Sequence, residues 1–320
     1  MVDFWQRKLA LKTFIMALAI MLVTACGKRD RDTTNLVGNS WLGYQPFYLQ
    51  HHLHREQQPS DISVTMLMSD VSVIRMLTNE AAGAAMLSLD NAIALQSLTA
   101  LDLCVALVMS HSVGADAILL HPNFVSYLDS EEPIRVGMED SALSRYMLSR
   151  WLEHTQIDPR RIERRIVLPN THLDEFARGN FDVVVAYAPF AQRLEQLGAT
   201  AIFTSLDIPN EIVDIVVVRQ QVWQRERDKL LALVTRSWDQ ALAALQTQEL
   251  QTMKYLEILT ELDGQQLQTV MGLVQFYTAD ESRVALVSDY PQWFATVAEN
   301  LVKAGVQQVT RDLPVCDGVL

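Results

Sequence analysis

Short apolar runs alternate with amphipathic segments along the first part of the chain. The apolar runs are short enough to be buried strands, and the segments between them have the apolar spacing of helices. Strands are predicted at residues 36–38, 62–67, 84–87 and 103–109, and helices at 45–53, 71–79 and 90–98. Because short strands that alternate with helices form parallel sheets, this pattern predicts a largely parallel sheet with helices on both faces.

The same alternation starts again after Ser112. Here the predicted strands are residues 117–120, 134–138, 166–168, 182–186 and 201–204, and the predicted helices are 141–154, 172–178 and a segment that follows Pro189. A second sheet of the same kind is the simplest interpretation.

The pattern changes near Asp214. Residues 215–218 form the last clear strand, and from Gln220 to the end the apolar positions have helical spacing. A helical tail of this length needs a sheet to pack against, so the chain is expected to cross between two lobes near Ser112 and to return near Asp214. The predicted lobes are residues 36–111 plus 214–320 and residues 112–213. The cleft between them is where a small-ligand site is expected.

The composition fits a globular α/β protein and excludes one class of partner. The chain has 320 residues and is 49% hydrophobic, enough for one large core or two of ordinary size. A formal net charge of −12 and a pI near 5.0 argue against nucleic acid as a partner, because phosphate binding needs a basic face. The basic cluster at residues 160–165 is interpreted as solvated surface ahead of a strand.

The N-terminus has the pattern of an export signal. Basic residues precede the apolar run 14–23, which is much shorter than the ~20 residues of a bilayer span. The sequence Val23-Thr24-Ala25-Cys26 resembles a bacterial lipobox, so residues 1–25 are predicted to be a lipoprotein signal peptide, Cys26 the lipidated residue and residues 26–35 a tether. The alternative is a plain signal peptide with an incidental cysteine. Gly27, in place of Asp, is compatible with an outer-membrane anchor in a Gram-negative cell.

Two further cysteines, Cys104 and Cys316, lie far apart in the sequence. An exported protein can join them in a disulfide. The sequence alone does not place them together, and a buried free thiol at Cys104, which lies in an apolar run, is the favoured interpretation.

The loop between the first strand and the first helix carries two large aromatic residues, Trp41 and Tyr44. In open α/β sheets such loops lie at the carboxyl ends of the strands and deliver side chains to a ligand. Gly43 permits a tight turn, and Pro46 fits the first turn of the following helix. Packing of both aromatics into the core is the alternative.

Several short motifs follow one another in a set order. They are Trp41-Leu-Gly-Tyr44-Gln-Pro46, Ala85-Met-Leu-Ser-Leu-Asp90, Ser112-Val-Gly-Ala-Asp116, Val136-Gly-Met138, Arg178-Gly-Asn-Phe-Asp182 and Asp214-Ile-Val-Val-Val218. Their order over residues 36–259 resembles the nitrate/sulfonate/taurine/thiamine-precursor class of ABC-transporter substrate-binding proteins. The resemblance implies a type II periplasmic-binding-protein fold with two hinge crossovers and a helical C-terminal tail. Such a fold closes on one small solute outside the cytoplasm.

The resemblance also implies the residues that contact the solute: Trp41, Tyr44, Asp90, Asn91, Ser112, Ser141, Tyr187 and Asp214. Ser112 and Asp214 match the two crossovers, and Ser141 matches a helix N-terminus, where free N–H groups favour an anion. Asp90 either binds the solute or only caps its helix. Ala188 departs from the family pattern, which has an acidic residue at this position.

Two other features allow alternatives. His51, His52 and His54 suggest a metal site, but no second cluster completes one, so a solvated surface is favoured and neither a metal nor a cofactor is predicted. Asp70 follows a predicted strand and either lines the cleft or caps the next helix.

Together these features predict a lipid-anchored, monomeric solute-binding protein at the periplasmic or other extracytoplasmic face of the membrane. It would capture a small polar or zwitterionic solute for an ABC permease and its ATPase. The alternative is a binding lipoprotein that signals to a membrane sensor protein. An enzyme is not expected, because the chain contains no Gly-x-Ser-x-Gly elbow, His-Glu-x-x-His motif or phosphate loop.

Overall fold

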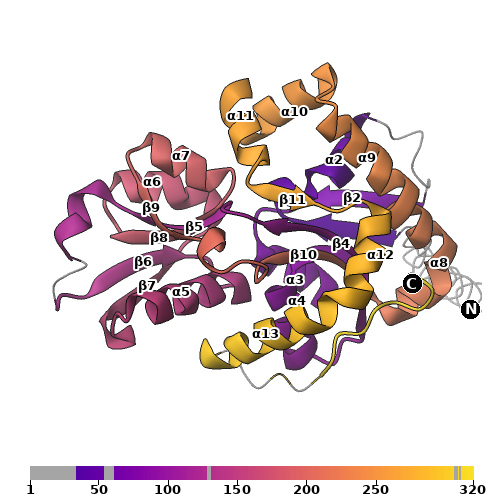
Figure 1. The fold of residues 1–320 in the computed structure, drawn as a ribbon, viewed down its shortest axis with the longest axis horizontal. Coiled ribbons are helices and arrows are strands. Elements are labelled where there is room, and N and C mark those ends of the chain that lie inside the picture. Colours follow the sequence, from indigo (N-terminus) through magenta and orange to yellow (C-terminus); the bar gives the residue numbers. More distant parts are fainter. Residues whose placement is uncertain (1–33, 54–60, 128–130, 306–308, 310) are drawn as a thin grey trace, which may run out of the picture.

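The structure, a computed structural model, describes residues 34–53, 61–127, 131–305, 309 and 311–320. These residues form two β-sheets of six and five strands, each covered by helices on both faces (Figure 1). We call the six-stranded sheet with its helices lobe 1 and the five-stranded sheet with its helices lobe 2.

The sheet of lobe 1 combines strands from both ends of the chain. Its order is β11-β4-β10-β3-β1-β2, with β1 at Thr34–Gly38, β2 at Ile62–Met66, β3 at Ala84–Ser88, β4 at Leu103–Ser112, β10 at Val213–Arg219 and β11 at Val274–Phe276. β1 is parallel to β2 and β3, whereas β10 is antiparallel to β3 and β4, and β11 is antiparallel to β4. Strands β1 to β4 thus run in one direction, as the prediction of a largely parallel sheet requires. β10 and β11 run in the opposite direction, because β10 returns from lobe 2 and enters between β3 and β4.

Helices cover lobe 1 from both sides. The N-terminal helices are the short η1 at Leu42–Tyr44, α2 at Gln45–Leu53, α3 at Asp70–Thr78 and α4 at Leu89–Leu98. The C-terminal segment adds α8 at Gln220–Ala232, the π-helical η7 at Leu233–Ser237, α9 at Trp238–Gln246, α10 at Leu250–Thr260, α11 at Gly264–Met271, α12 at Ala279–Ser288 and α13 at Tyr290–Lys303. The sequence predicted only helices in this segment, so it missed the three-residue edge strand β11.

The sheet of lobe 2 has the order β7-β6-β8-β5-β9. Its strands are β5 at Asp116–Leu120, β6 at Ile134–Met138, β7 at Ile162–Ile166, β8 at Val183–Tyr187 and β9 at Thr200–Thr204. α5 at Ala142–Thr155 lies on one face, and α6 at His172–Ala177 and α7 at Phe190–Gln196 lie on the other (Figure 1). Short 3-10 turns at Pro122–Tyr127, Pro159–Arg161, Pro169–Thr171 and Ser205–Asp207 complete the lobe. Because β5 is antiparallel to β8 and β9, this sheet is also mixed.

The strand predicted at residues 166–168 lies elsewhere. β7 begins at Ile162 and ends at Ile166, so residues 162–165 of the basic cluster belong to the strand and only Arg160 and Arg161 lie ahead of it. β7 is an edge strand with an exposed row of charged side chains, and such charges discourage pairing with another chain.

Two chain segments connect the lobes, one between β4 and β5 and one between β9 and β10. They are joined to each other, because the hydroxyl oxygens of Ser112 and Ser205 lie 2.7 Å apart and the Gly114 amide donates to Ser205 Oγ at 2.7 Å. The two connections therefore meet at one point between the sheets.

Cys104 and Cys316 form a disulfide, with their Cα atoms 4.9 Å apart. The favoured interpretation of Cys104 as a free thiol is therefore wrong. The end of the chain lies along β4, where the Val105 amide donates to the Pro314 carbonyl and the Cys316 amide donates to the Val105 carbonyl. This pairing, which depends on the complete fold, brings together two cysteines that are 212 residues apart.

The predicted signal peptide, Cys26 and Gly27 lie outside the described residues. β1 begins at Thr34, so the last two residues of the predicted tether belong to the sheet. Within the part of the chain that the structure describes, no helix has the length and apolar character needed to cross a membrane.

Candidate functional site

A small cavity of about 10 Å³ lies between the lobes. Asp70 at the start of α3 is the contribution of lobe 1, and lobe 2 supplies the rest: Asp116, Glu139, Ser141, Leu143, Ser144, Met147, Pro169, His172, Val185, Ala186 and Tyr187. A cavity of this size holds about one water molecule. A larger solute can enter only when the lobes move apart.

Carboxyl groups dominate the surroundings of this cavity. Asp70, Asp116 and Glu139 line it, and Asp90 and Asp214 are close enough to interact electrostatically with Asp70. All of them are buried, with exposed fractions of 4% or less. None takes part in an ion pair among the described residues, and the residues that line the cavity include no Lys or Arg.

Burial is the main cause of a raised pKa at each of these carboxyl groups. It raises the pKa of Asp70 to about 6, the pKa values of Asp90 and Asp214 to about 7, and the pKa of Glu139 to about 8. Burial and the charge of Asp214 raise the pKa of Asp116 well above its usual value. These shifts follow from the cost of placing charge in a site with little solvent and no basic partner.

The aromatic loop of lobe 1 is organised around Asp214 on β10. Trp41 Nε1 donates to Asp214 Oδ2 at 2.9 Å, the Tyr44 hydroxyl donates to Oδ1 at 3.3 Å, and Ser110 Oγ donates to Oδ2 at 2.7 Å. Gly43 makes this packing possible, since a Cβ atom there would lie 2.3 Å from Trp41 Nε1 and 2.6 Å from Ser110 Oγ. Both aromatic side chains are buried and neither lines the cavity, so they support the site from behind.

Trp41 also reaches the other lobe. Its ring meets Tyr187 at the end of β8 edge-on, with centroids 6.0 Å apart and planes at 85°. Tyr187 lines the cavity, so Trp41 supports this cavity residue from behind, across the boundary between the lobes.

Two helices begin at this boundary, and each is capped by a side chain of the opposite lobe. Asn91 on α4 accepts a hydrogen bond from the Ala142 amide at the start of α5 at 3.0 Å, while its amide group donates to Asp70 at 2.9 Å. In the reverse direction, Glu139 Oε1 accepts from the Val71 amide at the start of α3 at 2.9 Å. The N–H groups that the sequence assigned to an anion therefore donate to Asn91.

Ser141 and Ser112 have local structural partners. Ser141 is the N-cap of α5, accepts from the Ser144 amide at 3.2 Å and lines the cavity. Ser112 lies in the connection between the lobes, where its hydroxyl also accepts from the Asp116 amide at 3.0 Å.

Several buried polar atoms near the cavity have no hydrogen-bond partner of good geometry among the described residues. They are both carboxyl oxygens of Asp90, Glu139 Oε2, the Tyr187 hydroxyl and both ring nitrogens of His172. Ser88, Ser69, Ser40 and the Val167 backbone nevertheless lie near enough to Asp90, Glu139, Tyr187 and His172, respectively, to affect their pKa values. Burial also lowers the pKa of His172 to about 4, which keeps the ring neutral. Unsatisfied buried polar groups are uncommon in proteins, and one reason for them is that a ligand supplies the missing partner.

Sequence reasoning missed Asp116, Glu139 and His172 as cavity residues. Glu139 directly follows β6, and side chains at the carboxyl ends of parallel strands commonly meet a ligand, so this position carried a usable signal. Asp116 begins the first strand after the crossover. Nothing in the sequence around His172 marks it as part of a site.

The histidine-rich segment lies away from the cavity, on α2. The His52 ring packs 5.6 Å from Tyr255, and His54 lies outside the described residues. Among the residues whose positions are described, no group of three His, Cys, Asp or Glu side chains has the geometry to hold a metal ion.

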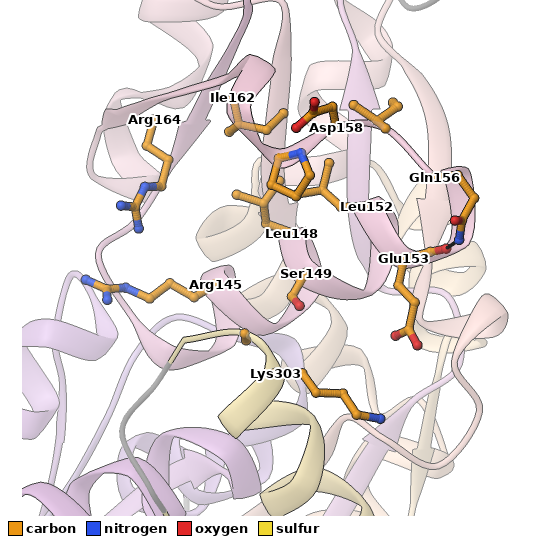
Figure 2. A pocket seen from close by; sticks show the side chains of 13 residues that line it. Arg145, Leu148, Ser149, Leu152, Glu153, Gln156, Asp158, Ile162, Arg164 and Lys303 are labelled. Carbon is orange, nitrogen blue, oxygen red and sulfur yellow. Dashed lines mark hydrogen bonds between the residues drawn. The ribbon is translucent and has the colours of Figure 1, made fainter.

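A larger groove of about 670 Å³ lies on the outer side of α5, against β7 and the end of α13 (Figure 2). Four of its five charged lining residues are paired: Arg145 with Asp140, Glu153 with Arg150, Asp158 with Arg160 and Lys303 with Glu299, whereas Arg164 takes part in no ion pair among the described residues. Because most of these charges are paired at the surface, whereas the inter-lobe cavity is lined by buried carboxyl groups without an ion pair, the inter-lobe cavity is the stronger candidate site.

Residues 66–254 match the NMT1-like family. The chain belongs to this family. The search of curated proteins found no match to this chain.

Solved structures share the fold of the NMT1-like chain at low sequence identity. The periplasmic aliphatic sulphonate binding protein SsuA of Escherichia coli is 14% identical, with 89% of this chain and 96% of that chain covered and a TM-score of 0.63. The ligand-binding component of an ABC-type import system of Staphylococcus aureus, with zinc bound, is 10% identical over 91% and 96% of the two chains, with a TM-score of 0.69. The periplasmic nitrate-binding protein NrtA of Synechocystis PCC 6803 is 11% identical over 86% of each chain, with a TM-score of 0.65. The predicted family resemblance and the two-lobed periplasmic-binding-protein fold are thus confirmed.

Proposed function

We propose that this protein is an extracytoplasmic solute-binding lipoprotein of an ABC import system. It captures one small polar solute between its lobes and presents it to the permease and ATPase, while lipid on Cys26 holds it to the membrane. The proposal keeps the division of the chain into residues 36–111 plus 214–320 and residues 112–213.

The observation that carries the proposal is the inter-lobe cavity itself. Its wall combines Asp70 of lobe 1 with residues of lobe 2, and it contains unsatisfied buried polar atoms on Glu139 and Tyr187. Because two connections meet at Ser112 and Ser205, the lobes can rotate about that point and open the cavity. The structural relatives that are named as sulphonate-binding, nitrate-binding and ABC import proteins add support for solute capture.

The predicted site residues take two kinds of role in this proposal. Ser141 and Tyr187 contact the solute directly, because they line the cavity. The others position the walls: Trp41, Tyr44 and Asp214 through their shared hydrogen bonds, Asn91 and Asp90 at the start of α4, and Ser112 at the crossover.

Thermal shift measurements with a metabolite library test the proposal. At least one small solute should raise the melting temperature without being converted. Tyr187→Phe, which removes only the unsatisfied hydroxyl, should weaken binding of that solute, whereas Tyr255→Phe on α10 should not. Binding by no solute, equal effects of the two variants, or turnover of the solute in a progress curve would each contradict the proposal.

A further inference from the structure

An anion-binding protein needs positive charge at its site, whereas the charged groups of this inter-lobe site are carboxyl groups. Asp70, Asp116 and Glu139 line the cavity, with Asp90 and Asp214 behind them, and the residues that line it include no Lys or Arg. A carboxylate, sulfonate or nitrate ion placed here would face several carboxyl groups at close range. An ionised carboxyl group repels the anion strongly because little solvent screens the two charges, and a protonated one supplies no positive charge to hold it.

The backbone donors that normally hold anions are already used. The amides of Ala142 and Leu143 at the start of α5 donate to Asn91 Oδ1, and the Val71 amide at the start of α3 donates to Glu139 Oε1. A helix N-terminus attracts an anion through such free N–H groups. At this site both helix starts instead meet side chains of the opposite lobe.

What the cavity offers is hydrogen-bond acceptors. Glu139, which lines the cavity and is 3% exposed, has no close partner for Oε2, and both oxygens of Asp90, which lies behind the cavity and is 0% exposed, also lack one. Tyr187, whose hydroxyl also lacks a close partner, lines the same cavity. A cationic ligand that carries N–H donors would satisfy these acceptors and would lower the raised pKa values of the carboxyl groups that it meets, so that they bind it as carboxylates.

Apolar side chains complete the lining. Leu143, Met147, Pro169, Val185 and Ala186 share the cavity with the acids, so part of the ligand is expected to be hydrocarbon. The described residues also present no three-residue metal-ligand cluster. Both features favour an organic ion over a bare metal ion.

We infer that the solute is a small organic cation with N–H donors, an amine, amidine or guanidine, and that oxyanions are excluded. This inference rests on the proposed function and narrows it, since a polar solute of any charge would satisfy the proposal above. It also separates this protein from the relatives that are named for sulphonate and nitrate.

The test screens the full-length protein by thermal shift and calorimetry at pH 7.5 with a metabolite library sorted by charge. Putrescine and agmatine serve as N–H-bearing cations, choline as a cation without N–H donors, ethanesulfonate and nitrate as anions, taurine as a zwitterion and Zn²⁺ as a metal ion. We expect the hits to be cations with N–H donors and choline to bind weakly.

Two variants locate the binding. Asp116→Asn combined with Glu139→Gln should weaken binding of the best cation about 30-fold or more, because each amide keeps the size of the side chain but loses the charge. Asp140→Asn, the matched control one residue beyond Glu139, removes an exposed carboxylate that is paired with Arg145 and should change binding less than about twofold. Unfolding without ligand verifies that the double variant is folded.

The outcomes separate the two proposals. A hit that is anionic, neutral, zwitterionic or a metal ion, or a cation whose binding survives the double variant, overturns the cation inference and leaves the proposed function standing. Absence of any hit from every charge class overturns both.

Discussion

The Val71 amide of lobe 1 donates to Glu139 of lobe 2 at 2.9 Å, and the Ala142 amide of lobe 2 donates to Asn91 of lobe 1 at 3.0 Å. Each helix start is thus satisfied by the opposite lobe. The four groups form a reciprocal pair of contacts between the lobes. In the proposed opening motion both helix starts would meet water, so we expect these contacts to contribute to the balance between open and closed states.

We predict that Asn91→Ala shifts this balance toward the open state. The variant removes the acceptor for the Ala142 amide and a donor to Asp70, and it should destabilise the fold by about 1–3 kcal/mol. Small-angle scattering should show a larger radius of gyration than in the parent protein, and urea unfolding gives the stability. Asn180→Ala, which removes an exposed hydrogen bond within lobe 2, is the control. An unchanged radius of gyration would show that Asn91 does not hold the lobes together.

The raised pKa values predict how stability depends on pH. The folded protein keeps protons on Asp70, Asp90, Asp214 and Glu139 up to about pH 6, 7, 7 and 8, whereas unfolded carboxyl groups release them near pH ~4. This contribution to stability is therefore fully present below pH ~4 and is lost as the pH rises through the folded values.

His172 has the opposite sign, because its lowered pKa of about 4 makes the folded protein bind fewer protons than the unfolded chain up to pH ~6.5. Above pH ~6.5, therefore, His172 opposes the loss of stability caused by the carboxyl groups least. Other titratable groups that face the site are Asp116, Tyr44 and Tyr187, all with pKa values raised by burial.

The urea concentration at the unfolding midpoint should consequently decrease as the pH rises from 6.5 to 8. The lower limit is the pH above which His172 no longer opposes the effect, and the upper limit is the pKa of Glu139. Glu139→Gln should flatten this dependence, since it removes the group with a pKa of about 8. The exposed Asp140→Asn should leave it unchanged. A midpoint that rises over this interval would contradict the assigned direction.

Gly43 is predicted to tolerate no side chain. A Cβ atom would come within 2.6 Å of both Trp41 Nε1 and Ser110 Oγ, which are the donors that hold Asp214. Gly43→Ala should lower stability by about 1–3 kcal/mol and weaken solute binding through the displaced Trp41. Gly264→Ala is a suitable control, because its added methyl meets only the flexible end of Glu257. Equal stability of the two variants in urea unfolding would show that the loop relaxes.

The disulfide is expected to stabilise lobe 1. It ties the C-terminal segment to β4, so the double variant Cys104→Ala/Cys316→Ala should lose about 2–4 kcal/mol. Unfolding with and without reductant provides the measurement. The reductant should destabilise the parent protein and leave the variant unaffected. If the unfolding of the parent protein is the same with and without reductant, the disulfide is absent.

The local pattern of apolar and polar residues was sufficient to predict most of the helices and strands. The sequence placed α2 at residues 45–53 and β6 at 134–138 with the bounds that the structure shows, because strands and helices of this length are determined by apolar spacing and turn residues. It failed for β7, whose charged, exposed edge position lacks the apolar signal, and for β11, which is too short to have one.

The candidate site was only partly accessible from sequence. Tyr187 and Ser141 were named in advance and line the cavity, and Trp41, Asn91 and Asp214 were named and lie around it. Asp116, Glu139 and His172 were not, because the chemistry of a cavity depends on which side chains meet across it.

The sequence by itself determined the alternation of strands and helices, the family and the aromatic loop, since these depend on neighbours along the chain. Only the tertiary structure decided that β10 runs antiparallel between β3 and β4, that Cys104 meets Cys316, and that carboxyl groups from distant segments gather at one inter-lobe cavity without a basic partner. The physical reason is that strand direction, disulfide pairing and the electrostatics of a buried site all depend on distances between residues far apart in the chain, which only the packed fold establishes.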